Sequence, residues 1–246
     1  MTEGYQPVPL PRLALLHTWA EEGLGEPHPV LGSEGCYVRG SVRAELARLS
    51  ARWYEELGLA DGGRLSPRFR RMLHTLADGA REVYCWSGFA DPARDQAVLV
   101  SMREERAVRL VVKGGLAWLD AVDARRWPEE FLAVLPEVPP APVRPVSVSR
   151  AEFEGTAPMD VLAKSDPAGE LREWLSAERD AVHQLYVLVR EPDGRCVRSL
   201  PLPVLDLVDH GRILTFLGDG EHGRTVNLRP RDTDEIAATL LATAEA

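Results

Sequence analysis

Residues 218–223, GDGEHG, match the GxGxxG spacing that holds the pyrophosphate of dinucleotides. That chemistry needs the glycines to follow a strand and to open a helix whose N-terminus meets the phosphates. Residues 225–229 are instead of strand-forming types, and Pro230 opposes a helix at this point. The carboxylates of Asp219 and Glu221 would also repel a phosphate. The motif therefore predicts a hairpin loop, and the sequence holds no Walker-type loop.

Histidine is the side chain best suited to proton transfer near neutral pH and a common metal ligand. No two histidines stand in the HxH or HExxH spacing that supports a metal site. His210 and His222 lie near aspartates in expected hairpin turns, where a solvated loop end is the favoured interpretation. No Gly-x-Ser-x-Gly elbow precedes an expected helix, so an activated serine is not predicted. The six histidines are His17, His28, His74, His183, His210 and His222. We therefore expect that the protein is not an enzyme and that it binds no cofactor and no metal.

Composition narrows the class of protein and its partners. The chain has 246 residues, 45% hydrophobic and 27% charged, with a net charge of −9. Acidic proteins do not attract nucleic acid or anionic membranes, so neither is an expected partner. Cys36, Cys85 and Cys196 are far apart, which supports neither structural zinc nor disulfides. The apolar run at residues 13–16 is too short to span a membrane, and we expect a cytoplasmic protein.

The last third of the chain predicts an antiparallel meander closed by a helix. Runs of β-branched and aromatic residues alternate with turn residues, such as Pro192-Asp-Gly194. Asp232 and Glu235 then have the spacing of a helix cap. The expected strands are residues 185–190, 196–200, 204–208, 213–217 and 225–229.

The first half predicts helices before a similar meander. Apolar spacing predicts helices at residues 13–23 and 42–57 and a third opened by Ser66-Pro67. Residues 25–40 leave room for short strands at 29–31 and 36–38, and residues 58–65 form a turn. The expected strands are residues 83–86, 97–102 and 108–112, and a helical stretch broken at Pro128 is expected over 116–135.

Residues 136–148 form a stiff, proline-rich linker between two similar halves, at about 10–135 and 149–246. The second half begins with two helices, one capped by Ser149 and Glu152 and one opened by Asp166-Pro167. The order of helices, meander and helix thus occurs twice. We predict a single α+β domain in which two meanders join edge to edge into a central antiparallel sheet, with helices on one side and quasi-two-fold symmetry.

Aromatic and apolar residues of the meanders offer a second kind of site, for a protein partner. Trp86 and Phe89 run into the loop at residues 87–95, where they could be exposed anchors, although core packing is at least as favoured. Residues 204–208 and 213–217 are apolar on both faces. Either helices cover both faces of the sheet, or part of one face is left for a partner helix.

The segment LADGGRLSPRFRRML at residues 59–73, followed by Glu82-Val-Tyr84 and the strand pair ending at Val112, resembles the EspG family of type VII (ESX) secretion proteins. The likeness continues through the proline-rich joint, residues 146–148 and the closing meander. It covers nearly the whole chain. The motif is a pattern of turns and apolar positions and holds no catalytic signature.

The resemblance implies a cytosolic chaperone with a central antiparallel sheet and quasi-two-fold symmetry. It implies that the chain binds the hydrophobic helical tip of a secretion substrate, PE–PPE-like or WXG-type, and keeps it soluble for export. The partner surface of the family is placed on one face of the sheet, an early loop and the C-terminal helical region. Transferred by element, it comprises Trp86, Phe89, Leu205, Leu207, Leu214 and Phe216.

Two other functions stay open at this point. The first is a dimeric structural or adaptor protein without a secretion role, in which the same apolar face mediates self-association. The second is a small-molecule enzyme with its site between the halves, which lacks a recognisable catalytic constellation. A monomer that binds a helical substrate would favour the chaperone, and a stable homodimer with that face buried would favour the adaptor.

Overall fold

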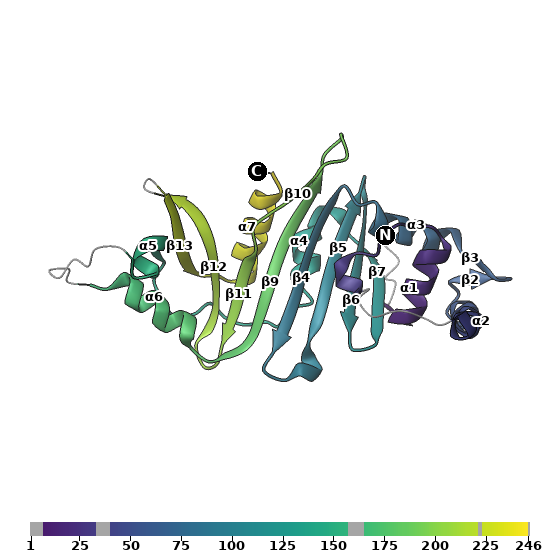
Figure 1. Ribbon diagram of the computed structural model, residues 1–246, viewed down its shortest axis with the longest axis horizontal. Coiled ribbons are helices and arrows are strands. Elements are labelled where there is room, and N and C mark those ends of the chain that lie inside the picture. Colours follow the sequence, from purple (N-terminus) through teal and green to yellow (C-terminus); the bar gives the residue numbers. More distant parts are fainter. Residues whose placement is uncertain (1–6, 33–39, 157–164, 221–222, 246) are drawn as a thin grey trace.

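The computed structural model describes residues 7–32, 40–156, 165–220 and 223–245. Within them, an 11-stranded antiparallel sheet runs along the whole molecule in the order β1-β7-β6-β5-β4-β9-β11-β12-β13-β8, and β10 pairs with β9 (Figure 1). The predicted α+β class with a central antiparallel sheet is confirmed. The strands are β1 (Val8–Pro11), β4 (Arg81–Phe89), β5 (Gln96–Arg103), β6 (Arg106–Lys113), β7 (Leu116–Val122), β8 (Val146–Ser149), β9 (Arg179–Arg190), β10 (Cys196–Arg198), β11 (Leu202–Leu207), β12 (Gly211–Gly220) and β13 (Gly223–Pro230).

The two meanders meet at β4 and β9, whose pairing runs from Arg81 opposite Val189 to Phe89 opposite Ala181. On each side of this seam the chain repeats one order. A short strand leads into helices, a meander follows, and a helix closes the half; the meander has four strands in the first half and five in the second, where β10 is the additional short strand. The outermost strand on each side is the short lead-in, β1 beside β7 and β8 beside β13. This topology has the quasi-two-fold arrangement expected from the sequence.

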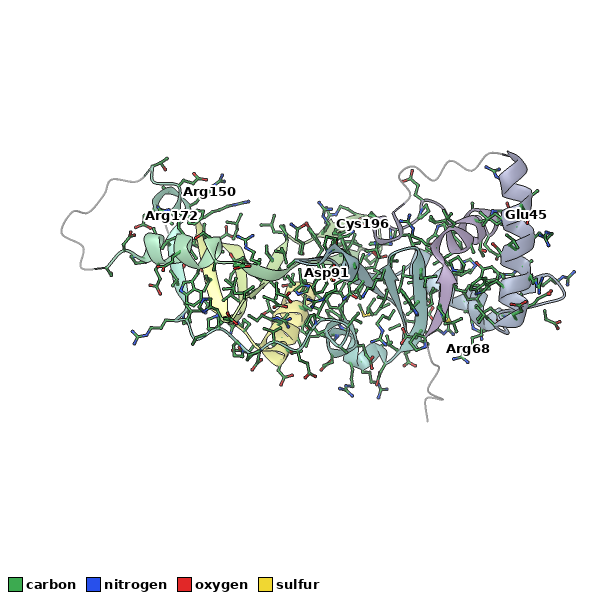
Figure 2. The ribbon with its side chains drawn as sticks, turned by 90° about the horizontal axis from the view of Figure 1, so that it is seen from below. Glu45, Arg68, Asp91, Arg150, Arg172 and Cys196 are labelled. Carbon is green, nitrogen blue, oxygen red and sulfur yellow. The ribbon has the colours of Figure 1, made fainter. Side chains whose placement is uncertain are left out.

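Helices cover both faces of the sheet, which corrects the expectation of helices on one side. We call the face that carries Tyr84 and Tyr186 the front and the face that carries Cys85 and Leu185 the back. The front is covered at one end by α1 (Arg12–Glu21), α2 (Gly40–Glu56) and α3 (Pro67–Ala77), and at the other by α5 (Arg150–Phe153) and α6 (Pro167–Ser176). The back is covered in the middle by α4 (Trp127–Leu132) and α7 (Thr233–Glu245) (Figure 2).

The helix starts follow the capping residues seen in the sequence. The Ser66 hydroxyl accepts a hydrogen bond from the backbone N–H of Phe69, and Ser149 and Glu152 form a reciprocal capping box. The Asp166 carboxylate likewise accepts the backbone N–H of Gly169. These local interactions satisfy free amides at the helix ends, which is why the sequence located them correctly.

Two predicted elements are wrong. Residues 116–122 are strand β7, with Ala117 and Leu119 buried on the front, and a helix begins only at Trp127. Pro128 therefore opens α4 rather than breaking a longer helix. Residues 29–31 form a 3₁₀ helix, η1 (Pro29–Leu31), and not a strand. The turn at 58–65 holds a small hairpin of β2 (Ala60–Asp61) and β3 (Arg64–Leu65). Two further 3₁₀ helices are η2 (Pro92–Arg94) and η3 (Ala124–Arg126). The strand expected at 36–38 lies outside the described residues.

The proline-rich segment between the halves is fastened to the sheet. The backbone N–H of Arg212 donates to the carbonyl of Pro139, and the N–H of Ala141 donates to the carbonyl of Arg212. Gly211 has a positive φ of 94°, and a Cβ there would lie 2.6 Å from the Pro139 carbonyl oxygen. Only glycine therefore lets the segment approach β12 this closely. Its last residues continue as β8.

Candidate partner-binding surface

Trp86 and Phe89 lie on opposite faces of β4, because side chains alternate along a strand. Trp86 points to the front and is 36% exposed. Phe89 is on the back, where its ring packs 5.6 Å from that of His183 and the guanidinium of Arg94 lies 4.4 Å from its centre. The two aromatics predicted to act together therefore cannot contact one partner surface.

The leucines predicted for the partner surface lie in the core of the structure. Leu205 and Leu207 are buried on the front, in the cluster that α5 and α6 cover. Leu214 is buried on the back. Phe216 is half-buried on the same face and packs against the cluster that contains α7. Of the six residues, Trp86 alone lies exposed on the front.

Between the two helical layers, the middle of the front face is uncovered (Figure 1). We call this region the central strip and define it by Trp86, Gln184, Tyr186, Pro203, Thr215 and Leu217. The pairing register places Trp86 opposite Gln184, and Gln184 opposite Pro203. Leu217 extends the strip onto β12 and is 42% exposed. The strip is therefore a largely apolar surface across four strands, built on rigid sheet backbone.

An aromatic cluster anchors one end of the strip. The rings of Tyr84 and Tyr186 stack at 5.2 Å, and Trp86 meets both edge-on, at 5.4 and 5.7 Å. The guanidinium of Arg198, on β10, lies 5.4 Å from the Tyr186 ring. Such packing restricts the rotamers of Trp86, so an exposed tryptophan here loses little conformational entropy when it binds a partner.

Beside these rings, on the same face of β4, lies a buried ionisable pair. Nε2 of His28 is 3.5 Å from a carboxylate oxygen of Glu82, and the His28 ring packs edge-on against Tyr84. Nδ1 of His28 accepts the backbone N–H of Val30, so the neutral ring carries its proton on Nε2, toward Glu82. Burial lowers the pKa of His28 to about 4. Burial also raises the pKa of Glu82 to about 7, against an opposing effect of Arg190. Near neutral pH the His28 ring is therefore neutral and Glu82 is only partly ionised, so the two residues do not form an ion pair.

The back face holds a second polar cluster, which the sequence did not indicate. The Ser87 hydroxyl is 2.8 Å from Nδ1 of His183, and Nε2 of that ring is 3.0 Å from the Asp206 carboxylate. These are the residue types of a hydrolytic triad. All three side chains are buried, however, and a nucleophile must reach its substrate. The ring also faces serine through Nδ1, the reverse of the chymotrypsin arrangement.

Arg212 completes this cluster and explains its role. Its guanidinium donates to both Asp206 oxygens, at 2.6 and 2.8 Å, and to the carbonyl of Pro136. Burial raises the pKa of Asp206, but the hydrogen bonds from Arg212 and His183 outweigh it, and the net pKa is lowered. The cluster connects β4, β9, β11 and β12 with the inter-half segment. Its geometry fits a structural role, and no group of metal-ligating side chains occurs among the described residues.

The strand pattern identified Tyr186 and Leu217 as strand residues but did not show that they are exposed. Each has a buried or core-directed neighbour in sequence, so either face of its strand was apolar enough to belong to the core. Only the position of the helices shows which face is uncovered.

No described helix is both long and apolar enough to cross a membrane.

The chain was compared with known proteins. The model of the EspG family matches residues 11–241. Among solved structures, the chain is similar to the Mycobacterium tuberculosis type VII secretion system chaperone EspG5, whose structure was determined in complex with a PE25–PPE41 dimer. The TM-score is 0.67 at 14% sequence identity, over 96% of this chain and 95% of that one. At this identity the likeness shows the fold. No curated protein sequence matches the chain.

Proposed function

Because this chain belongs to the EspG family, we propose that it is a type VII secretion chaperone that binds a helical secretion substrate on the central strip. The observation that carries the proposal is an exposed apolar strip in the middle of a sheet whose other front-face regions are covered by helices. The related EspG5 was solved in complex with a PE25–PPE41 dimer. We therefore propose a PE–PPE-like pair as the first candidate substrate and a WXG-type substrate as the second.

The strip has the composition expected for contact with the apolar end of a helical partner. Trp86 and Leu217 offer large apolar side chains, while Gln184 and Thr215 offer hydrogen-bonding groups between them. Large aromatic and apolar side chains with polar groups beside them are typical of interfaces that exclude water. Binding would shield apolar helix ends from water, which keeps an unassembled substrate soluble. We propose the cytoplasm as the place where this occurs.

The proposal is tested by co-expression with candidate substrates from the source genome. A tagged chain is purified together with an untagged PE–PPE pair, and in parallel with a WXG-type protein, and the stoichiometry is measured by light scattering. We expect a stoichiometric complex whose affinity falls at least tenfold on Trp86→Asp and on Leu217→Asp, because a charge in a desolvated contact is costly.

Leu116→Asp is the matched control. The exposed fraction of Leu116, 38%, is similar to that of Trp86, 36%. Leu116 lies at the start of β7, however, which β6 and β5 separate from β4. This variant should bind like the wild type. A complex that survives both strip variants would remove the central strip as the site. Failure to form a complex with any helical substrate, together with a stable homodimer that buries the strip, would favour the dimeric adaptor instead.

A further inference from the structure

A hollow on the surface lies between α3, the start of β6 and the end of β7, and has a volume of about 250 Å³. Its floor is apolar, because Met72, Ala107 and Val108 line it and are almost fully buried. Figure 2 shows this part of the molecule at Arg68, toward the end of the sheet opposite Arg150. In the sheet, β5 separates β6 from β4, where the central strip begins, so the hollow is not part of that strip.

Arginines form the rim of the hollow. Arg68 and Arg71 stand three residues apart in α3, which places them on one side of the helix, and Arg106 begins β6. All three residues are exposed. Glu105, in the turn before β6, contributes a carboxylate. With three guanidiniums against one carboxylate, the described lining residues have a formal charge of +2, in a chain whose net charge is −9.

Arg71 has donors that the rest of the described chain does not use. Its neighbour Arg70 pairs with Glu22 at 2.7 Å, and Arg103 pairs with Asp78 at 3.4 Å. Arg71 forms no such ion pair with the described residues, and its guanidinium donates no hydrogen bond to them. A guanidinium carries five N–H donors. Those of Arg71 are therefore available to an anion from outside the chain.

The other charges of the rim also favour an anion. Like charges one helical turn apart, such as those of Arg68 and Arg71, repel one another, and an anion between them offsets this repulsion. Arg106 has Glu104 at 3.9 Å, which is a long and exposed pair. Such pairs contribute little to stability, so Arg106 exchanges Glu104 for another carboxylate at little cost. Glu105 opposes an anion, but it is exposed and solvent screens its charge.

We propose that this hollow binds an acidic segment of a partner protein, with a carboxylate on Arg71 and Arg106 and an adjacent apolar side chain on the floor. The planar fork of a guanidinium matches a carboxylate through two parallel hydrogen bonds. Sites that enclose small molecules have volumes of about 300–1,000 Å³. This hollow is smaller and open, so a chain segment that lies across it fits better than an enclosed metabolite. The inference does not depend on the proposed function, since the central strip stays free.

Two-dimensional NMR of the isotope-labelled full chain tests the proposal, with a capped hexapeptide of alternating aspartate and leucine as the probe. We expect saturable shifts of the backbone amides in α3 and at the start of β6, and weaker binding when the salt concentration rises from about 0.05 M to about 0.3 M. The matched asparagine–leucine peptide should bind at least about tenfold more weakly, because its amides carry no charge. Inorganic phosphate should bind at least about fivefold more weakly, because it makes no apolar contact.

Arginine variants locate the site. Arg71→Gln should weaken binding of the aspartate–leucine peptide at least about fivefold, and Arg71→Glu should abolish it, because a like charge then faces the ligand. Arg150→Gln is the matched control, because Arg150 is an exposed arginine of α5 at the other end of the sheet and should not matter. Near-ultraviolet circular dichroism verifies that each variant keeps its packing. The absence of saturable binding would overturn the proposal. So would equal binding of the two peptides, equal binding of peptide and phosphate, or binding that Arg71→Glu leaves unchanged.

Discussion

Two buried carboxylates on opposite faces of one sheet have opposite acid–base behaviour. Glu82 lies on the front of β4, beside His28, and burial raises its pKa to about 7. Asp206 lies on the back of β11, where burial also raises its pKa, but two hydrogen bonds from Arg212 and one from His183 lower it overall. Both side chains are almost fully buried. The difference therefore comes from the partners and not from the degree of burial.

The comparison shows how the fold treats its two faces. The back cluster crosses the seam between the halves and ends on the inter-half segment, where a permanent ion pair fixes geometry. The front pair packs against the aromatic cluster of the proposed partner site, where a neutral pair avoids burying two charges next to a surface that binding would dry further. The following predictions test this distinction in order of expected effect.

Arg212→Met should have the largest effect. It leaves the Asp206 carboxylate buried without its cation and removes the bond to the Pro136 carbonyl. Breaking a buried ion pair from one side costs about 3–5 kcal/mol of unfolding free energy. Urea unfolding at pH 7 measures the loss. The double variant Asp206→Asn/Arg212→Met should be less destabilised than the sum of the single variants, and a loss below about 1 kcal/mol for Arg212→Met would contradict the role given to the pair.

Glu82→Gln should change the pH dependence of stability. A raised pKa means that the folded state holds a proton that the unfolded state releases at about pH 4.5. The wild type therefore loses stability as the pH rises from about 4.5 through about 7, by up to about 3 kcal/mol. Glutamine has no proton to lose, so the variant should gain stability relative to the wild type at pH 8 but not at pH 4.5.

Urea unfolding of both proteins at the two pH values gives the result. Asp206→Asn is the contrast, because the pKa of Asp206 is lowered in the folded state. A lowered pKa stabilises the folded state at every pH above the ordinary pKa of the group. That stability is lost only as the pH falls through the folded pKa. That variant should be destabilised equally at pH 6 and at pH 8. A stability difference between Glu82→Gln and the wild type that is the same at pH 4.5 and at pH 8 would show that folding does not raise the pKa of Glu82, and would end the comparison.

Much of the fold could be predicted from local signals. Ser66-Pro67, the Ser149–Glu152 box and Asp166-Pro167 each determine a helix start through backbone amides that lie within three residues. The turns around Gly194 separate strands for the same kind of reason. The helix expected at residues 116–122 was wrong because Leu-Ala-Trp-Leu-Asp-Ala-Val is apolar at spacings that suit either a helix or a strand buried on both faces. Pairing with β6 and β1 decides the outcome.

The candidate site could be predicted only in part. Trp86 was singled out because it was expected to run into a loop at residues 87–95, whereas it lies within β4, which ends at Phe89. The burial of Leu205, Leu207 and Leu214 could not be predicted, because strands apolar on both faces do not reveal which face a distant helix will cover. The helices that decide this, α6 and α7, begin at residues 167 and 233. The Ser87–His183–Asp206–Arg212 cluster joins residues far apart in sequence, for which spacing gives no signal.

Ser87→Ala is the smallest of the expected effects and separates charge from hydrogen bonding in the back cluster. Nε2 of His183 faces the carboxylate and so carries the proton of a neutral ring, which leaves Nδ1 to accept the Ser87 hydroxyl. The hydroxyl in turn lies 3.6 Å from the Cys85 thiol, whose pKa burial raises to about 12, so it stays protonated. Alanine removes one neutral hydrogen bond and leaves the Asp206–Arg212 pair intact. The loss of unfolding free energy should be about 1–2 kcal/mol in urea unfolding and the same at pH 6 and pH 8. A loss as large as that of Arg212→Met would mean that the hydroxyl, and not the ion pair, organises the cluster, and the contrast between the two carboxylates would then need another cause.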